Sequence, residues 1–208
     1  MTDTQLLLIC GMHRSGTSLI TKAFELFGFG LGDNLMAANT DNPKGFFEDL
    51  DVVALNNLIL EASGAAWDIP PVALGKAVVW NADHIASGVS LLKTKLANSP
   101  QLAIKDPRVC LLLPFWQAVA KAADCPIKLC FVVRNPLDVA ASLAKRNDFS
   151  QAQSLTLTHV HWQQMLQSAS DHDLVVSYDA LLDDPEHALA RLGNWLSISP
   201  EAHKKRHF

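Results

Sequence analysis

A segment near the start of the chain combines glycines, hydroxyl side chains and an arginine in a pattern suited to binding an oxyanion. Residues 11–18 read GMHRSGTS, in which four residues separate the two glycines. This is the spacing of a phosphate-binding loop, but Thr17 stands where such loops carry a lysine, and Arg14 supplies the positive charge instead. A guanidinium is a planar set of donors that matches a cluster of anionic oxygens. We therefore expect a phosphate or sulfate group to bind here, and the missing lysine argues against a nucleoside triphosphatase.

The residues on either side of this loop predict the two elements that would position it. Residues 6–9 are four consecutive apolar residues, which is typical of a strand buried on both faces of a parallel sheet. After the loop, apolar residues recur at helical spacing from Leu19 to Phe27. A strand, a glycine-containing loop and a helix would direct backbone N–H groups and the positive end of a helix dipole at one point. An ordinary strand-to-helix turn remains the alternative.

A second arginine is predicted at the carboxyl end of another strand. Residues 127–133 (IKLCFVV) are the clearest strand after the first, and Arg134 follows them. Asn135 and Pro136 are a helix N-cap and a first-turn proline, so a helix is expected next, with Ser142 two turns along it. Open α/β sheets bind ligands at the carboxyl ends of their strands. The pattern therefore favours a ligand contact for Arg134.

A carboxylate lies at the end of a loop rich in turn-forming residues. Residues 39–49 read NTDNPKGFFED, and an apolar helical pattern follows them. Glu48 could act as a general base at the wall of an active site. Alternatively, Glu48 or Asp49 could cap the helix, where a carboxylate meets free N–H groups. The sequence leaves both interpretations open.

Several of these segments resemble one enzyme family. GMHRSGTS, NPKGFFED, KDPR (residues 105–108) and VVRNPLDVAASLAKR (residues 132–146) are similar to segments of the sulfotransferases that use 3′-phosphoadenosine 5′-phosphosulfate (PAPS). Arginine in the loop is more like the bacterial and the carbohydrate or tyrosyl-protein branches than the cytosolic small-molecule branch. The resemblance extends over nearly the whole chain and is weakest at residues 67–100.

The resemblance implies a set of site residues. It assigns Arg134 and Ser142 to the 3′-phosphate of the nucleotide and Glu48 to the role of general base. His13, inside the loop beside Arg14, is a second candidate base, because an imidazole there could also reach the acceptor. The residues implied for the 5′-phosphosulfate are Gly11, Arg14, Ser15, Gly16, Thr17 and Ser18.

The implied reaction is in-line transfer of a sulfuryl group from PAPS to an acceptor hydroxyl or amine. The loop would stabilise the charge that develops on the bridging oxygen, and a base would take the acceptor proton. The sulfuryl group carries less charge than a phosphoryl group, so no metal is required. The acceptor is expected to be a small molecule or a carbohydrate, and residues from about 30 to 100 are expected to form an acceptor-side insert.

Two other functions fit some of the same residues. A small-molecule kinase could use the loop and hold magnesium through Asp106, at the end of a short strand over residues 101–104. Lys105 and Arg108 flank that carboxylate, however, and a basic strand end suits an anion better than a magnesium ion. Alternatively, Asp106 and Arg108 could form a pair that has no role in function and only shapes the turn. The second alternative function is a nucleotide-binding module without catalysis.

Composition excludes some broad classes. The chain has 208 residues, of which 49% are hydrophobic, so it can bury a full core. A net charge of −4 argues against a nucleic-acid-binding protein. No apolar run is long enough for a membrane span, and the first residues lack the basic region of a signal peptide. Four cysteines without CxxC spacing are predicted to be reduced core residues, so we expect a cytoplasmic protein.

Strands that alternate with helices predict the fold class. We expect an α/β protein with a P-loop-like, doubly wound and mostly parallel sheet flanked by helices. We expect residues 1–208 to form a single sulfotransferase-like domain. The last six residues, HKKRHF, are expected to be a solvated basic end. Many sulfotransferases complete the 3′-phosphate site with a basic, glycine-containing segment near the C-terminus, and this chain has none there.

Overall fold

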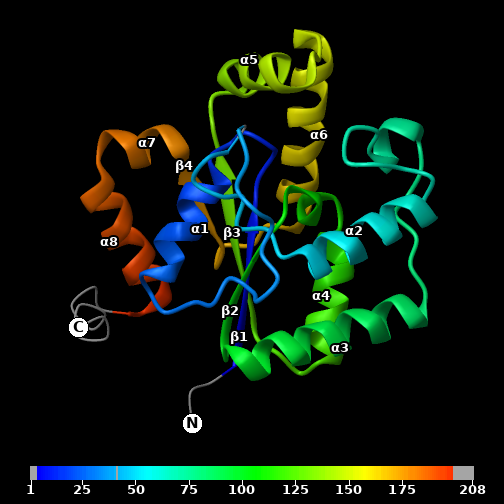
Figure 1. Ribbon diagram of the computed structural model, residues 1–208, viewed down its shortest axis with the longest axis vertical. Helices are drawn as coiled ribbons and strands as arrows, with labels where there is room; N and C mark the ends of the chain where they lie inside the picture. Colours follow the sequence, from blue (N-terminus) through cyan, green and yellow to red (C-terminus); the bar gives the residue numbers. More distant parts are fainter. Residues whose placement is uncertain (1–3, 41, 199–208) are drawn as a thin grey trace.

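A computed structural model describes residues 4–40 and 42–198. Its centre is a sheet of four parallel strands in the order β2-β1-β3-β4 (Figure 1). The strands are β1 (Gln5–Cys10), β2 (Gln101–Lys105), β3 (Ile127–Val133) and β4 (Leu174–Ser177). The predicted α/β class with a parallel sheet flanked by helices is confirmed. The C-terminal tail HKKRHF lies outside the described residues.

Helices cover both faces of this sheet. They are α1 (Thr17–Glu25), α2 (Leu50–Ala62), α3 (Ala82–Asn98), α4 (Leu113–Ala122), α5 (Pro136–Asn147), α6 (Gln151–Ser168), α7 (Tyr178–Asp183) and α8 (Pro185–Leu196). Two 3₁₀ turns, η1 (Pro71–Leu74) and η2 (Pro107–Leu111), lie between them. Among the described residues, no helix is both long and apolar enough to cross a membrane.

The alternation of side chains along β1 divides the core in two. Successive residues of a strand point to opposite faces, so Leu6 and Leu8 pack with α2, α3, α4 and α6, while Leu7 and Ile9 pack with α1 and α8. All four side chains are fully buried. Each contributes about 1.5–3 kcal/mol when it is removed from water. The four cysteines are free and buried within the same core.

The parallel arrangement brings the strand ends that carry polar residues to one edge. β1 leads into the loop at residues 11–16, β2 into Asp106, and β3 into Arg134. Because neighbouring parallel strands end side by side, these three connections meet at the carboxyl edge of the sheet. The long segment between α1 and β2 returns across this edge. Its residues 33–36 and 48–50 lie against each other, with Met36 N donating to Glu48 O at 2.8 Å.

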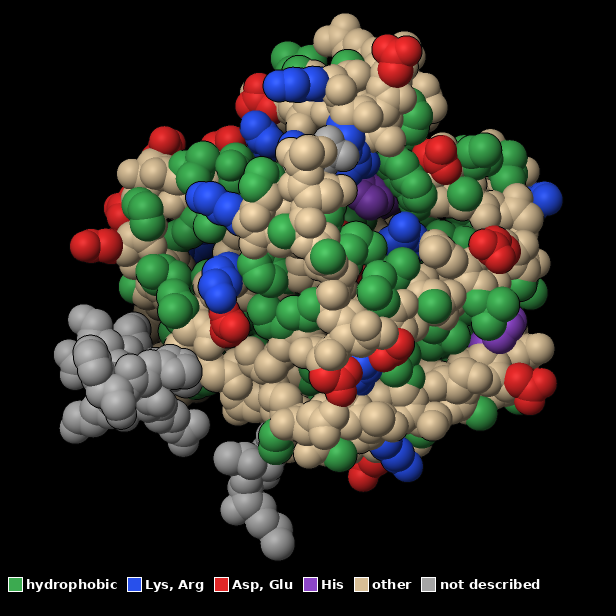
Figure 2. All heavy atoms as spheres, viewed as in Figure 1, with side chains coloured by type: hydrophobic (Ala, Val, Ile, Leu, Met, Phe, Trp, Pro, Cys, Tyr) green, Lys and Arg blue, Asp and Glu red, His purple; other side chains and the backbone are tan. Residues whose placement is uncertain are grey.

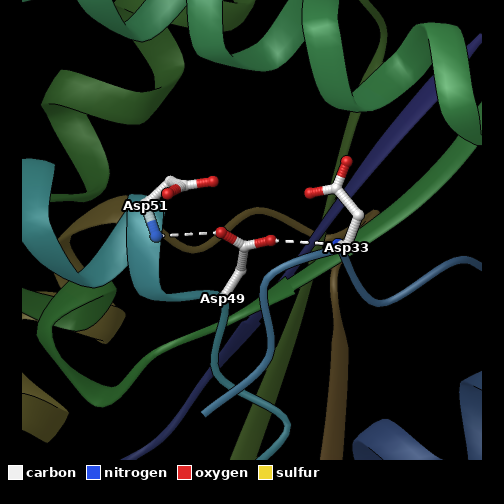
Figure 3. Close-up of side chains that lie close together, drawn as sticks. All are labelled: Asp33, Asp49 and Asp51. Atoms are coloured by element: carbon white, nitrogen blue, oxygen red, sulfur yellow. Dashed lines mark hydrogen bonds between the residues drawn. The ribbon is translucent and has the colours of Figure 1, made fainter.

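Three aspartates stabilise that returning segment around the start of α2. Asp49 caps α2 by accepting from Asp51 N at 3.0 Å, and it also accepts from Asp33 N at 3.2 Å (Figure 3). Oxygens of Asp33, Asp49 and Asp51 lie within 4.8 Å of one another, a spacing that a metal ion could use. In this protein the ammonium of Lys95, from α3, contacts all three carboxylates. Burial lowers the pKa of Lys95, but the hydrogen bonds that its ammonium donates to the three aspartates outweigh burial and raise this pKa above its usual range.

We predict that Lys95→Met destabilises the fold. Lys95 and Asp49 are each about 95% buried, and removing one partner leaves the other charge unpaired. Asp33 and Asp51 are half-exposed, so solvent screens their interactions with Lys95. We expect the free energy of unfolding to fall by roughly 1–3 kcal/mol in urea titrations. Lys93→Met, an exposed change on the same helix, is the control. Equal stability of the two variants would contradict a structural role for Lys95.

Candidate functional site

The loop between β1 and α1 adopts a conformation that depends on its glycines. Gly16 has a φ of 89°, and a side chain there would overlap the ring of Tyr178. A Cβ atom at Gly11 would lie 2.9 Å from the carbonyl oxygen of Val132 in β3. The buried hydroxyl of Ser15 donates to Met12 O at 2.6 Å and so fixes the turn from inside. The first N–H groups of α1 have no acceptor within the helix and therefore suit an anion.

Arg14 is held at the centre of this site by two other predicted residues. It has a φ of 68°, which is uncommon outside glycine, so the fold rather than local preference sets its position. Its Nε donates to Ser142 Oγ of α5 at 2.7 Å, and its carbonyl accepts from Arg134 Nη1 at 3.0 Å. Asn135 caps α5 as the sequence predicts, through a contact with Leu137 N. The fold thus brings Arg14, Arg134 and Ser142 together.

Arg134 lies between the loop and the last strand. Its guanidinium lies 4.7 Å from the centre of the Tyr178 ring, and Tyr178 is the first residue after β4. The Nε of Arg134 is buried, and within the described residues no protein acceptor contacts it. A buried N–H group without a partner is costly. The group therefore suits an anionic ligand in the cavity beside it.

Glu48 lies in the site as one partner of a buried ion pair. Its Oε1 lies 2.6 Å from Lys105 Nζ at the end of β2, and both side chains are about 95% buried. Lys105 Nζ also donates to Phe46 O at 3.0 Å. Burial raises the pKa of Glu48, and the neighbouring charge of Lys105 partly offsets this rise. Capping of α2 belongs to Asp49, so Glu48 is left for another role.

A chain of buried polar contacts extends from this pair into the core. Arg108 Nη1 lies 3.9 Å from Glu48 Oε2 and donates to Asp106 Oδ1 at 2.8 Å. The other oxygen of Asp106 accepts from Asn56 Nδ2 at 2.9 Å, and the side chain of Asn56 accepts from Trp116 Nε1 at the same distance. Asp106 is completely buried and caps η2. These contacts indicate that Asp106 positions Arg108 and stabilises the turn η2.

His13 lies at the start of the loop in an aromatic environment. Its ring centre is 4.2 Å from that of Trp67, and its buried Nε2 contacts no acceptor in the described part of the chain. Burial is the largest effect that holds the pKa of His13 well below its usual range, and the charge of Arg146 lowers it further. Both effects favour the neutral imidazole and make it a weaker base than an exposed histidine.

A cavity of about 530 Å³ joins these groups. Figure 2 shows Lys and Arg side chains gathered on this face of the molecule, below α5. Of the residues predicted from the sequence, those that line the cavity are His13, Arg14, Gly16, Thr17, Ser18, Glu48 and Arg134. Gly11, Ser15 and Ser142 do not line it. They shape the loop or hold Arg14 instead.

The cavity wall includes further residues to which the sequence assigned no role. Tyr178, Arg146, Lys44 and Lys22 are among these. Lys105, which the sequence places at a basic strand end, lines the cavity as well. Arg146 lies four residues after Ser142 and therefore on the same face of α5, a signal that helical spacing could have supplied. Tyr178 follows directly after a strand, at the edge where ligands bind.

Ser18 has a contact that the sequence did not predict. Its hydroxyl donates to Phe46 O at 3.2 Å and accepts from Asn42 Nδ2 at 3.3 Å. The first turn of α1 is thereby attached to the segment that carries Glu48.

Comparisons with known proteins bear on the fold. No family model matches the sequence, and no curated protein matches it. The structure is similar to the sulfotransferase domain of the Synechococcus PCC 7002 olefin synthase, with a TM-score of 0.52 and 16% identity over 96% of this chain and 75% of that one. It is also similar to the sulfotransferase STF9 from Mycobacterium avium, with a TM-score of 0.57 and 14% identity over 99% of this chain and 68% of that one.

The fold is that of a sulfotransferase domain. Identities of 14% and 16% establish this likeness for the fold alone. The resemblance inferred from the sequence is thus confirmed at the level of structure, over almost the whole chain. Within the sulfotransferase fold, the cation-lined cavity at the carboxyl edge is the candidate active site.

We predict that Lys105 keeps Glu48 ionised. Burial raises the pKa of the Glu48 carboxyl, and the ammonium 2.6 Å away opposes that rise. In Lys105→Met, burial and the charge of Asp106 still raise the pKa of Glu48, and the weaker charge of Arg108 opposes them, so the Glu48 carboxyl should titrate at a higher pH than in the unaltered protein. Carbon-13 NMR of labelled glutamate carboxyls measures this directly, and Glu48→Gln identifies the signal. An unchanged titration would show that the ion pair does not form in solution.

Proposed function

We propose that the protein is a PAPS-dependent sulfotransferase that moves a sulfuryl group to an acceptor hydroxyl or amine. The observation that carries this proposal is the meeting of three parts in one cavity: the glycine loop with Arg14, the strand-end Arg134, and the buried Glu48–Lys105 pair. The sulfotransferase fold supports the same assignment. Among the described residues, several cations and one carboxylate line the cavity, which fits a polyanionic donor and a single base.

The donor would lie along the loop. Backbone N–H groups of the loop, together with Arg14 and Thr17, would bind the 5′-phosphosulfate. The Nε of Arg134, which contacts no acceptor among the described residues, would donate to the 3′-phosphate. Ser142 accepts from Arg14 Nε and would serve this anion site by holding Arg14. Gly11 and Ser15 would serve the site by shaping the loop. Ser18 lines the cavity at the first turn of α1 and would complete the anion site there.

The reaction would proceed by in-line displacement at sulfur. The acceptor oxygen or nitrogen would form a bond to sulfur while the bond from sulfur to the bridging oxygen breaks. The bridging oxygen would keep the electron pair and leave on adenosine 3′,5′-bisphosphate, where Arg14 stabilises its charge. Glu48 would accept the acceptor proton. Lys105 keeps this carboxylate ready to receive a proton, while burial makes it a stronger base than an exposed carboxylate. His13, with its lowered pKa, is the weaker candidate.

The geometry of Asp106 argues against the kinase alternative. A magnesium-binding aspartate should present an oxygen to the nucleotide. Here both oxygens of Asp106 already accept hydrogen bonds from Asn56 and Arg108, and the side chain is fully buried outside the cavity lining. We propose that the reaction needs no metal.

We further propose that residues from about 30 to 100 form the acceptor side of one domain. This segment contributes Asn42, Lys44, Phe46, Phe47 and Glu48 to the cavity. It therefore supplies much of the wall that the donor loop does not. The acceptor would be a small molecule or a carbohydrate, and the cytoplasmic location remains the prediction made from the sequence.

The nucleotide preference tests the donor assignment. Adenosine 3′,5′-bisphosphate should bind much more tightly than AMP, or than ATP with magnesium, because only the bisphosphate places a phosphate at Arg134. Removing that contact in Arg134→Gln should lower the affinity by roughly 10- to 150-fold, the value of a charge-assisted hydrogen bond. Isothermal titration calorimetry measures both effects. A preference for ATP with magnesium would refute the sulfotransferase assignment and favour a kinase.

Glu48→Gln separates an enzyme from a binding module. Glutamine keeps the size of the side chain but cannot accept a proton, so turnover should fall by about a hundred- to ten-thousand-fold. The affinity for the bisphosphate should remain unchanged. Labelled PAPS and a panel of acceptors provide the assay, and Glu61→Gln, an exposed change on α2, is the control. If Glu48→Gln turns over as fast as the control, Glu48 is not the base, and His13→Gln becomes the next variant to measure.

A further inference from the structure

One part of the cavity wall is basic but is not needed by the donor as assigned above. Arg134 and Tyr178 contact the loop at Arg14 and Gly16, whereas Trp67 contacts it at His13. Trp67 belongs to the segment between α2 and η1, within the proposed acceptor side. The cation that lies over Trp67 is Arg146, and it lines the cavity together with His13.

The surroundings of Arg146 hold its guanidinium in place. Its Nε donates to Asn147 Oδ1 at 2.6 Å, and its guanidinium carbon lies 5.7 Å from the centre of the Trp67 ring. Trp67 is itself packed against His13 at 4.2 Å and against Phe149 at 5.8 Å. Contact with an aromatic face orients a guanidinium but leaves its charge in place. Arg146 is therefore a positioned cation in the wall of the cavity.

The charge of Arg146 reaches His13 in the wall of the same cavity. After burial, it is the largest effect that lowers the pKa of His13, at the start of the donor loop. Lys105 and Arg108 also lower the pKa of His13, although each of them is paired with a carboxylate, Glu48 and Asp106 respectively. A cationic acceptor would be repelled from this region. An anionic one would be attracted and could accept two parallel hydrogen bonds from a guanidinium.

We propose that the acceptor carries a carboxylate or phosphoryl group and that Arg146 binds it. The proposal rests on the proposed function, because it places the donor on Arg14 and Arg134 and the acceptor next to Trp67. Arg146 is thereby a specificity-determining residue. It selects an acceptor by charge, while Glu48 takes the proton from the reacting hydroxyl or amine.

Matched pairs of probes test this without any need for turnover. The full chain, saturated with adenosine 3′,5′-bisphosphate, is titrated with D-glucuronate or D-glucose 6-phosphate against D-glucose, and with 4-hydroxybenzoate against 4-hydroxybenzamide. Binding is followed by ligand-observed NMR. The anionic member of each pair should bind about tenfold to a hundredfold more tightly than its neutral partner, the range expected for one charge-assisted contact.

Variants assign this preference to Arg146. Arg146→Gln should abolish the difference between the two members of each pair and leave the affinity for the bisphosphate within about twofold. Lys145→Gln removes the same charge from the exposed neighbouring residue on α5 and should keep the preference. Arg146→Lys keeps the charge but lacks the planar set of donors, so it should keep part of the preference for the anionic probe.

Three results would overturn the proposal. One is equal binding of the two members of each pair by the unaltered protein, or no binding of any anionic probe at millimolar concentration. Another is equal loss of preference in Lys145→Gln and Arg146→Gln. This result would indicate that the preference comes from the overall positive potential of this region and not from a contact with Arg146. The third is a large loss of bisphosphate affinity in Arg146→Gln, which would assign Arg146 to the donor. Failure of the proposed function is seen separately, as weak bisphosphate binding by the unaltered protein before any probe is added.

Discussion

The buried ion pair between Glu48 and Lys105 joins the two parts of the chain from which the cavity is made. Lys105 belongs to an edge strand of the sheet, and Glu48 belongs to the segment that returns from the first helix. Because both side chains are almost fully buried, neither charge can be solvated alone, and removing one partner of such a pair is strongly destabilising. The ammonium also binds the carbonyl oxygen of Phe46. These contacts fix the wall opposite the glycine loop, so the shape of the cavity depends on them.

Local sequence patterns predicted the scaffold of this site well. The apolar run of β1, the glycines after it, and the Asn135-Pro136 start of α5 each follow from the chemistry of a few neighbouring residues. These signals placed Arg14 and Arg134 at the carboxyl edge of the sheet, where the structure has them. The parallel arrangement then followed from the alternation of strands and helices.

Contacts between distant segments could not be predicted in the same way. Glu48 and Lys105 are 57 positions apart, and Arg14 and Ser142 are 128 apart. The resemblance pairs Ser142 with Arg134 on a phosphate, whereas in the structure its hydroxyl contacts Arg14. Which side chains meet is decided by the order of strands in the sheet and by the packing of helices on it. No local pattern encodes that order. Overall charge was equally uninformative, because a chain with a net charge of −4 still gathers its cations around one recess.

The position of β1 in the sheet has a consequence for how the chain is made. Leu6 pairs with Leu102 on one side and with Ile127 on the other, so β1 leaves the ribosome before either partner strand, and these follow 96 and 121 positions later in the chain. At a synthesis rate of about 5–20 residues per second, it waits roughly 5–25 seconds with four large apolar side chains and both strand edges unsatisfied. Closing such long loops is also slow. Early in its life, this strand is therefore a natural substrate for chaperones and the part of the chain most exposed to aggregation.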